Sequence, residues 1–178
     1  QDVKRAVSNS VNAFGGIDIL VANAGFASAA LFEKTSSKLW DKNMDILSKG
    51  CFLISREVYQ KMIDQKNGGS IIFVSSKNSL NASKGASAYS VAKSSLLHLS
   101  RSIALEGSSH KIRSNVVNPD AVIQNSKIWQ GEWTKQRAIS NKISVNQVEE
   151  FYKNRSLLKV SILPEDIAEG IYFFASSK

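Results

Sequence analysis

A short apolar run near the middle of the chain, residues 70–75, constrains the fold more than any other stretch. It is rich in residues that favour strands, and Gly68 and Gly69 introduce it. A run of this kind, without polar alternation, is typical of a buried strand in a parallel sheet. Ser76 follows at the carboxyl end of the expected strand, the edge where open α/β sheets bind their ligands. The sequence therefore predicts a functional site beside Ser76.

A tyrosine and a lysine one helical turn apart form the second feature. Tyr89 and Lys93 are four residues apart in a segment predicted to be helical, so their side chains would share one face. The pKa of a phenol is about 10, and a neighbouring ammonium or the positive end of a helix dipole would lower it. The pair could then act as a general acid or base near neutral pH. The plainer alternative is a partly buried tyrosine beside a solvated lysine.

Four motifs in this order resemble the short-chain dehydrogenases and reductases. They are Ser76, the Tyr-x-x-x-Lys pair that starts thirteen residues later, Asn23-Ala24-Gly25 after an expected strand at 17–22, and Asn118-Pro119 after an expected strand at 113–117. The resemblance covers nearly the whole chain. It implies an α/β fold with a Rossmann-like, doubly wound parallel sheet, and NAD or NADP as the cofactor.

The resemblance also implies a role for each motif. Ser76 would hydrogen-bond the substrate oxygen, Tyr89 would exchange the proton, and Lys93 would lower the pKa of Tyr89 and grip the nicotinamide ribose. The residues expected to bind the cofactor are Asn23, Ala24, Gly25, Tyr89, Lys93 and Pro119. The reaction would be hydride transfer between the nicotinamide and a small hydroxyaldehyde, alcohol or carbonyl substrate.

The expected fold is incomplete when compared with this family. A helix at residues 2–14 comes first, with no glycine-rich turn before it, and the chain stops at Lys178 before the family's last strand. We therefore expect residues 1–178 to be part of a longer NAD(P)-binding domain that lacks the first three strands and the last one. In that case the strand at 17–22 would lie at an open edge, and the fragment alone would be inactive.

Three residues depart from the family pattern. Leu47 stands where the family has an asparagine that helps to hold a water for proton relay, Asp120 replaces a glycine, and Gln124 replaces a threonine. Asp120 is interpreted as a turn residue, with a polar group facing the cofactor as the alternative. Together these departures support a second hypothesis, a catalytically impaired binding or scaffold protein that keeps the fold.

Two long helices are expected, at residues 36–66 and 87–106. Ser36 or Ser37 would cap the first, and Gly50 interrupts it. Its buried stripe is predicted to be Trp40, Met44, Leu47, Cys51, Ile54 or Ser55, Val58 and Met62. By resemblance, both helices would pack against their copies in a homodimer or homotetramer.

The segment 124–163 has the least regular pattern. It contains Trp129, Trp133 and a capping-box-like start at residues 146–149. The resemblance implies a helical insertion that covers the substrate, with Asn78 and Trp129 as substrate contacts. The alternative is a peripheral helical hairpin that buries two tryptophans.

Charge and composition exclude several other classes. The 178 residues carry a net charge of +8, but the basic residues are scattered, which favours a solvated surface over nucleic-acid binding. No apolar run is long enough to suggest a membrane span. The single cysteine, Cys51, fits a reducing compartment, so the protein is expected to be cytoplasmic. His98 and His110 have no acidic or cysteine neighbours at metal-ligand spacing, so no metal site is predicted.

A narrower resemblance comes from the details around these motifs. Residues 76–78, 118–122, 126–129 and 149–152 are similar to the dehydrogenase half of bifunctional rhamnulose-1-phosphate aldolase/lactaldehyde dehydrogenases. This implies an aldolase domain upstream in the same protein, a part in rhamnose metabolism as an alcohol dehydrogenase, and lactaldehyde as a candidate substrate.

Overall fold

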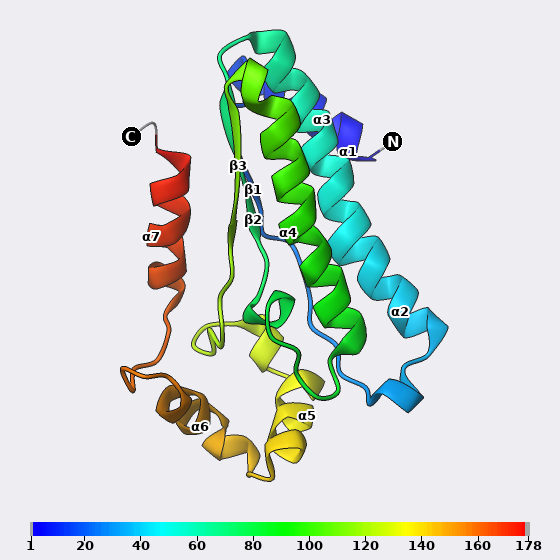
Figure 1. Cartoon of the computed structure of the whole chain (residues 1–178), viewed down its shortest axis with the longest axis vertical. Coiled ribbons are helices and arrows are strands. Elements are labelled where there is room, and N and C mark those ends of the chain that lie inside the picture. The colour runs from blue at the N-terminus through cyan, green and yellow to red at the C-terminus, as the bar shows by residue number, and fades with distance from the viewer. Residues whose placement is uncertain (1, 177–178) are drawn as a thin grey trace.

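A three-stranded parallel sheet forms the centre of the structure, a computed structural model that describes residues 2–176. The strands β1 (Ile19–Ala22), β2 (Gly69–Val74) and β3 (Ile112–Val117) lie in the order β1-β2-β3 (Figure 1). Val21 lies opposite Ile72, and Phe73 lies opposite Val116. The three strands predicted at 17–22, 70–75 and 113–117 are therefore confirmed, with ends shifted by one or two residues.

One face of the sheet is covered by three helices, α1 (Asp2–Phe14), α3 (Gly50–Gln65) and α4 (Ser87–Gly107) (Figure 1). Val7, Val58, Met62 and Leu96 from these helices pack against Ile71 and Phe73 of β2. Both β2 side chains are fully buried, because β2 lies between two other strands and under two helices. This cluster fixes where β2 ends and α4 begins, the two points on which the predicted site depends.

The long helix expected at 36–66 is present, with an irregular turn in its middle. It consists of α2 (Ser37–Asn43), a π-helical turn (Met44–Lys49) and α3. Ser36 caps α2, as predicted, because its Oγ accepts a hydrogen bond from the Leu39 amide at 3.2 Å. The irregular turn lies just before Gly50, and such turns are frequent at functional sites.

The predicted stripe of this helix is largely buried. Leu47, Cys51, Ser55, Val58 and Met62 are buried. Trp40 was predicted to be buried as well, but it is 36% exposed because it lies in α2, beyond the end of the sheet.

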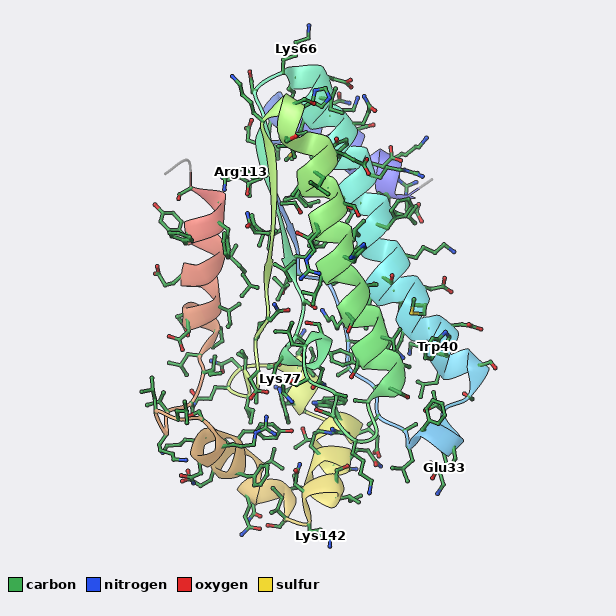
Figure 2. All side chains as sticks on the ribbon, viewed as in Figure 1. Glu33, Trp40, Lys66, Lys77, Arg113 and Lys142 are labelled. Carbon is green, nitrogen blue, oxygen red and sulfur yellow. The ribbon has the colours of Figure 1, made fainter. Side chains whose placement is uncertain are left out.

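The opposite face of the sheet is covered by α7 (Pro164–Ala175), so the described helices lie on both faces, as a doubly wound fold requires (Figure 1). The Ser70 hydroxyl of β2 donates a hydrogen bond to the Phe174 carbonyl at 2.8 Å. Arg113 of β3 donates to the same carbonyl, and Figure 2 shows it beside the end of α7. Proline in the first turn and Asp166, which accepts a hydrogen bond from the Leu163 amide, start α7.

The edge strand β1 is only partly covered. Ile19 is 49% exposed and Val21 is 39% exposed, although both are apolar strand residues. The open edge predicted for this strand is thus present among the described residues. The predicted absence of the first three strands and the last strand stays a prediction.

The segment between β3 and α7 forms two helices, α5 (Glu132–Asn141) and α6 (Val148–Arg155), at the carboxyl end of the sheet (Figure 1). The capping box differs from the predicted one. Ser144 and Gln147 form it, because the chain first makes a short 3-10 turn that α6 then continues. The 3-10 turns of the structure are Phe32–Lys34, Lys77–Ser79, Ser108–His110, Lys127–Trp129 and Val145–Gln147.

No helix within residues 2–176 is both long and apolar enough to cross a membrane.

Candidate active site

Ser76, Tyr89 and Lys93 come together where β2 ends and α4 begins. Ser76 follows β2 and starts a 3-10 turn, in which its Oγ accepts a hydrogen bond from the Asn78 amide at 3.2 Å. Tyr89 lies in the first turn of α4, and Lys93 lies one turn later. All three side chains are at least nine-tenths buried. The convergence predicted for these residues is thus present in the fold.

Burial raises the pKa of the Tyr89 phenol, and the nearby Ser76 side chain opposes this rise by hydrogen bonding. The sequence predicted that Lys93 would lower the pKa of Tyr89 instead. The dominant effect on this pKa is removal of the phenol from water, and the predicted role of Lys93 stays a prediction. Ser76 is the group that favours the phenolate.

Lys93 is held by hydrogen bonds at its side chain and at its main chain. Its ammonium donates a hydrogen bond to the Val74 carbonyl at 2.7 Å, and its own carbonyl accepts one from the Ser75 hydroxyl at 2.8 Å. Burial lowers the pKa of Lys93, and the Cys51 thiol opposes this effect. An ammonium has three donors, so the contact with Val74 leaves donors for a group in the adjoining cavity.

A cavity of about 700 Å³ adjoins these side chains. It is within the range typical of small-molecule and cofactor sites. The catalytic residues predicted from the sequence line it, and so do all of the predicted cofactor residues, which are Asn23, Ala24, Gly25, Tyr89, Lys93 and Pro119. Residues that are far apart in the sequence therefore share one wall at the carboxyl edge of the sheet.

Gly25 lies in this wall close to Leu47 and Lys93. A Cβ atom added there would be 3.1 Å from Cδ2 of Leu47 and 3.8 Å from Nζ of Lys93. The first distance is shorter than an ordinary van der Waals contact, so a side chain would displace Leu47. The absence of a side chain keeps the space beside the lysine open.

The predicted substrate contacts, Asn78 and Trp129, also line the cavity. The side-chain amide oxygen of Asn78 accepts a hydrogen bond from the Ser83 hydroxyl at 2.7 Å. Trp129 packs edge-on against Trp133 and Tyr152, with ring centroids 6.2 Å and 5.1 Å apart. Trp133 in turn lies 5.5 Å from the ring of Tyr89. The segment 124–163 thus supplies an aromatic wall that faces the tyrosine.

Several lining residues were not predicted from the sequence. They are Lys77, Trp133, Arg137 and Tyr152. One signal was available: Trp129, Trp133 and Arg137 follow one another at intervals of four residues, a spacing that places side chains on one helical face.

The three departures from the family pattern have structural explanations. Leu47 is fully buried against Gly25. Asp120 was interpreted as a turn residue, but its carboxylate pairs with Arg155 at 3.0 Å. Gln124 donates a hydrogen bond to the Glu149 carboxylate at 2.8 Å. Asp120 and Gln124 therefore attach the loop after β3 to α6, so they do not favour the scaffold hypothesis.

The remaining candidates do not form a second centre. Burial raises the pKa of the Cys51 thiol, with Lys93 opposing, which suits an unreactive core residue. Within residues 2–176, no group of three or more histidine, cysteine or acidic side chains is arranged to hold a metal ion.

Comparison with known proteins defines the class. Residues 1–136 match the family described as short chain dehydrogenase. The chain is 51% identical over 178 residues to the oxidoreductase YuxG of Bacillus subtilis, which covers all of this chain and 26% of YuxG. It is 35% identical over 114 residues to an acetoacetyl-CoA reductase from Acinetobacter, covering 64% of this chain and 46% of the reductase.

A solved structure gives the same result for the fold. Sorbitol-6-phosphate 2-dehydrogenase SrlD from Erwinia amylovora superimposes with a TM-score of 0.93 at 28% identity, covering 99% of this chain and 68% of SrlD. The chain belongs to the short-chain dehydrogenase/reductase family and has its Rossmann-like α/β fold. It spans about a quarter of the length of YuxG and just under half that of the acetoacetyl-CoA reductase.

Proposed function

We propose that the protein is a nicotinamide-dependent oxidoreductase that interconverts a small alcohol and the corresponding carbonyl compound. The observation that carries the proposal is the meeting of Ser76, Tyr89 and Lys93 on the cavity that Asn23, Ala24 and Gly25 also line. Family membership supports the same reaction class.

The residues present fit NAD or NADP. Lys93 is a buried ammonium with one hydrogen bond to the protein, so it has donors for ribose hydroxyls. Gly25 leaves space beside it that a side chain would fill. Asn23, Ala24 and Pro119 line the same wall. The cofactor, when bound, supplies or accepts the hydride.

The chain's own residues position the substrate and move the proton. Ser76 orients the substrate oxygen by hydrogen bonding, and Tyr89 gives a proton to it or takes one from it. Lys93 holds a positive charge beside the reacting groups. The wall of Trp129 and Trp133 excludes water, which strengthens these interactions. The segment 124–163 then serves as the substrate cover.

Finer features are part of the same proposal. The substrate is a small hydroxyaldehyde such as lactaldehyde, by the narrower resemblance that also implies a linked aldolase domain. Asn78 and Trp129 contact this substrate. The helices at 36–66 and 87–106 form a homodimer or homotetramer, and the protein works in the cytoplasm.

Replacement of the phenol tests the proposal. Tyr89→Phe removes the proton donor and keeps the ring against Trp133, so turnover should fall by about 10²–10⁴-fold, the usual contribution of a general acid or base. NADH binding, measured by fluorescence, should be nearly unchanged. Turnover of small hydroxyaldehydes at the wild-type rate in this variant would remove Tyr89 from the chemistry. Full-length wild-type protein that binds no dinucleotide would overturn the proposal itself.

A further inference from the structure

The cavity has a second polar region that the proposed hydride transfer does not use. Arg137 of α5 and Lys77 of the 3-10 turn after β2 both line it. Figure 2 shows Lys77 at the end of the sheet close to the segment that carries α5. We define these two side chains as the basic pair.

Arg137 is buried without full hydrogen bonding. It is 3% exposed, and its guanidinium lies 4.5 Å from the centre of the Trp133 ring. One terminal nitrogen donates a hydrogen bond to the Lys84 carbonyl at 2.8 Å. Its Nε is buried and has no hydrogen-bond partner. An unpaired buried donor on a charged group is costly, so the guanidinium, whose side chain lines the cavity, favours a ligand that carries a negative charge.

Lys77 adds a second positive charge to the same region. Its ammonium donates a hydrogen bond to the Ser83 hydroxyl at 3.2 Å. Burial lowers the pKa of the Lys77 ammonium, and the nearby carboxylate of Asp120 opposes this shift. The positive charges of Arg155 and Arg137 lower the pKa of Lys77 further. The two cations therefore repel one another across a partly dehydrated space.

The protein does not neutralise the basic pair. Among residues 2–176, the ion pairs of the structure include neither Arg137 nor Lys77. Asp120 is near Lys77, but its carboxylate is paired with Arg155 at 3.0 Å. Two buried or half-buried cations without a counter-ion are stabilised by an anion that enters with the ligand.

We propose that the basic pair binds an anionic group of the substrate, a carboxylate or a phosphate ester, while the carbonyl or alcohol end lies at Ser76 and Tyr89. This inference rests on the proposed function and refines its substrate class. Trp133 contacts both the Tyr89 ring and the Arg137 guanidinium, so the two ends of the substrate would lie along one wall. Within the proposed class of small alcohols and carbonyl compounds, the preferred substrate then carries an anionic group, which lactaldehyde lacks.

Direct anion binding is the first test. Acetate and inorganic phosphate are titrated separately against the protein at constant ionic strength with chloride, and the fluorescence of Trp129 and Trp133 is followed. At least one anion should change the signal with saturation, and Arg137→Gln should weaken its binding by about tenfold or more, since a hydrogen bond to a charged group is lost. Lys135→Gln, an exposed change on the same helix, is the control and should bind like the wild type.

Folding defects are separated from loss of binding by a second variant. Lys77→Gln removes the other charge from a half-buried position in a short turn, and circular dichroism verifies the fold of each variant. The inference is overturned if neither anion binds the wild type with saturation. It is also overturned if both Arg137→Gln and Lys77→Gln bind the anions with the affinity of the wild type. NADH binding weakened by these variants while acetate and phosphate binding is kept also overturns it, because the basic pair would then serve the cofactor.

Kinetics on matched substrates decide between the two anions. Glyceraldehyde is compared with glyceraldehyde 3-phosphate, and butanal with succinic semialdehyde. The anionic member of one pair should have the higher kcat/KM, and Arg137→Gln should reduce that preference by about tenfold, with a smaller loss for the neutral aldehyde than for the anionic one. Equal loss for both members of each pair overturns the inference. Because the titration needs no turnover, its result stands even if the proposed hydride transfer fails.

Discussion

Two walls of the cavity are built in different ways. The wall of β2 and α4 is held by main-chain groups and a fully buried apolar cluster: Lys93 bonds to the Val74 carbonyl, and Phe73 lies beneath it. The wall of α5 and α6 is held by side-chain contacts, such as the edge-on tryptophans and the pair of Asp120 with Arg155. The comparison teaches that the groups proposed to react lie on a wall held by the main chain, whereas Trp129 and Arg137, proposed to contact the substrate, lie on a wall held by side chains.

The largest effect on stability is expected in the wall of β2 and α4. Phe73→Ala removes a fully buried ring and leaves a cavity, so it should lower the free energy of unfolding by about 3–5 kcal/mol. Urea denaturation measures this loss. Ile139→Ala, at a position of α5 that is 68% exposed, should change stability by about 0.5 kcal/mol or less. An equal decrease in the free energy of unfolding in the two variants would show that the two walls do not differ in this way.

A smaller effect, and a functional one, is expected in the wall of α5 and α6. Trp129→Ala removes the ring that packs on Trp133 and Tyr152, so substrate binding should weaken and KM should rise by about tenfold, since one buried aromatic contact is worth roughly 1–1.5 kcal/mol. Steady-state kinetics would show it, with unfolding by urea as the control. A large loss of stability with an unchanged KM would make this segment part of the core.

The pH dependence of alcohol oxidation tests the roles of Tyr89 and Ser76 in the wall of β2 and α4. Alcohol oxidation needs the Tyr89 phenolate, and burial raises the pKa of this phenol, so the rate should increase as the pH rises toward and above about 10. Ser76→Ala removes the group that opposes the rise, and the profile should move to still higher pH. Reduction needs the protonated phenol, so its rate near neutral pH should be independent of this titration. A profile that moves to lower pH in the variant would contradict the assigned role of Ser76.

The smallest effect concerns the ion pair between the loop after β3 and α6. Asp120→Asn weakens a pair that is more than a third exposed, and such pairs contribute about 0–1 kcal/mol. Unfolding at low and high salt should show a small difference that disappears at high salt. If the variant instead lost several kcal/mol, the second wall would be as firmly built as the first.

The parts of the fold that the sequence predicted are those with short-range signals. The strand at 70–75 was visible as an apolar run after a pair of glycines, and Tyr89 and Lys93 were visible as a pair one helical turn apart. Tyr89 and Lys93 lie close to Ser76 because the end of the strand and the start of the helix are at the same edge of a parallel sheet. The site could therefore be located before any distances were known.

The parts that were missed depend on contacts between distant residues. Asp120 was assigned to a turn because its partner, Arg155, lies 35 residues away in the sequence. Arg137 was overlooked because its role depends on the Lys84 carbonyl, 53 residues before it. The effect of burial on the pKa of Tyr89 was not foreseen, because burial of the phenol cannot be deduced from a four-residue spacing.

The double attachment of Lys93, through its ammonium to Val74 and through its carbonyl to the Ser75 hydroxyl, has a consequence for turnover. Strand and helix are joined at two points a few atoms apart, which resists their separation. Under the proposed function, substrate and product would therefore exchange past residues 124–163, and release and chemistry would be governed by separate parts of the chain.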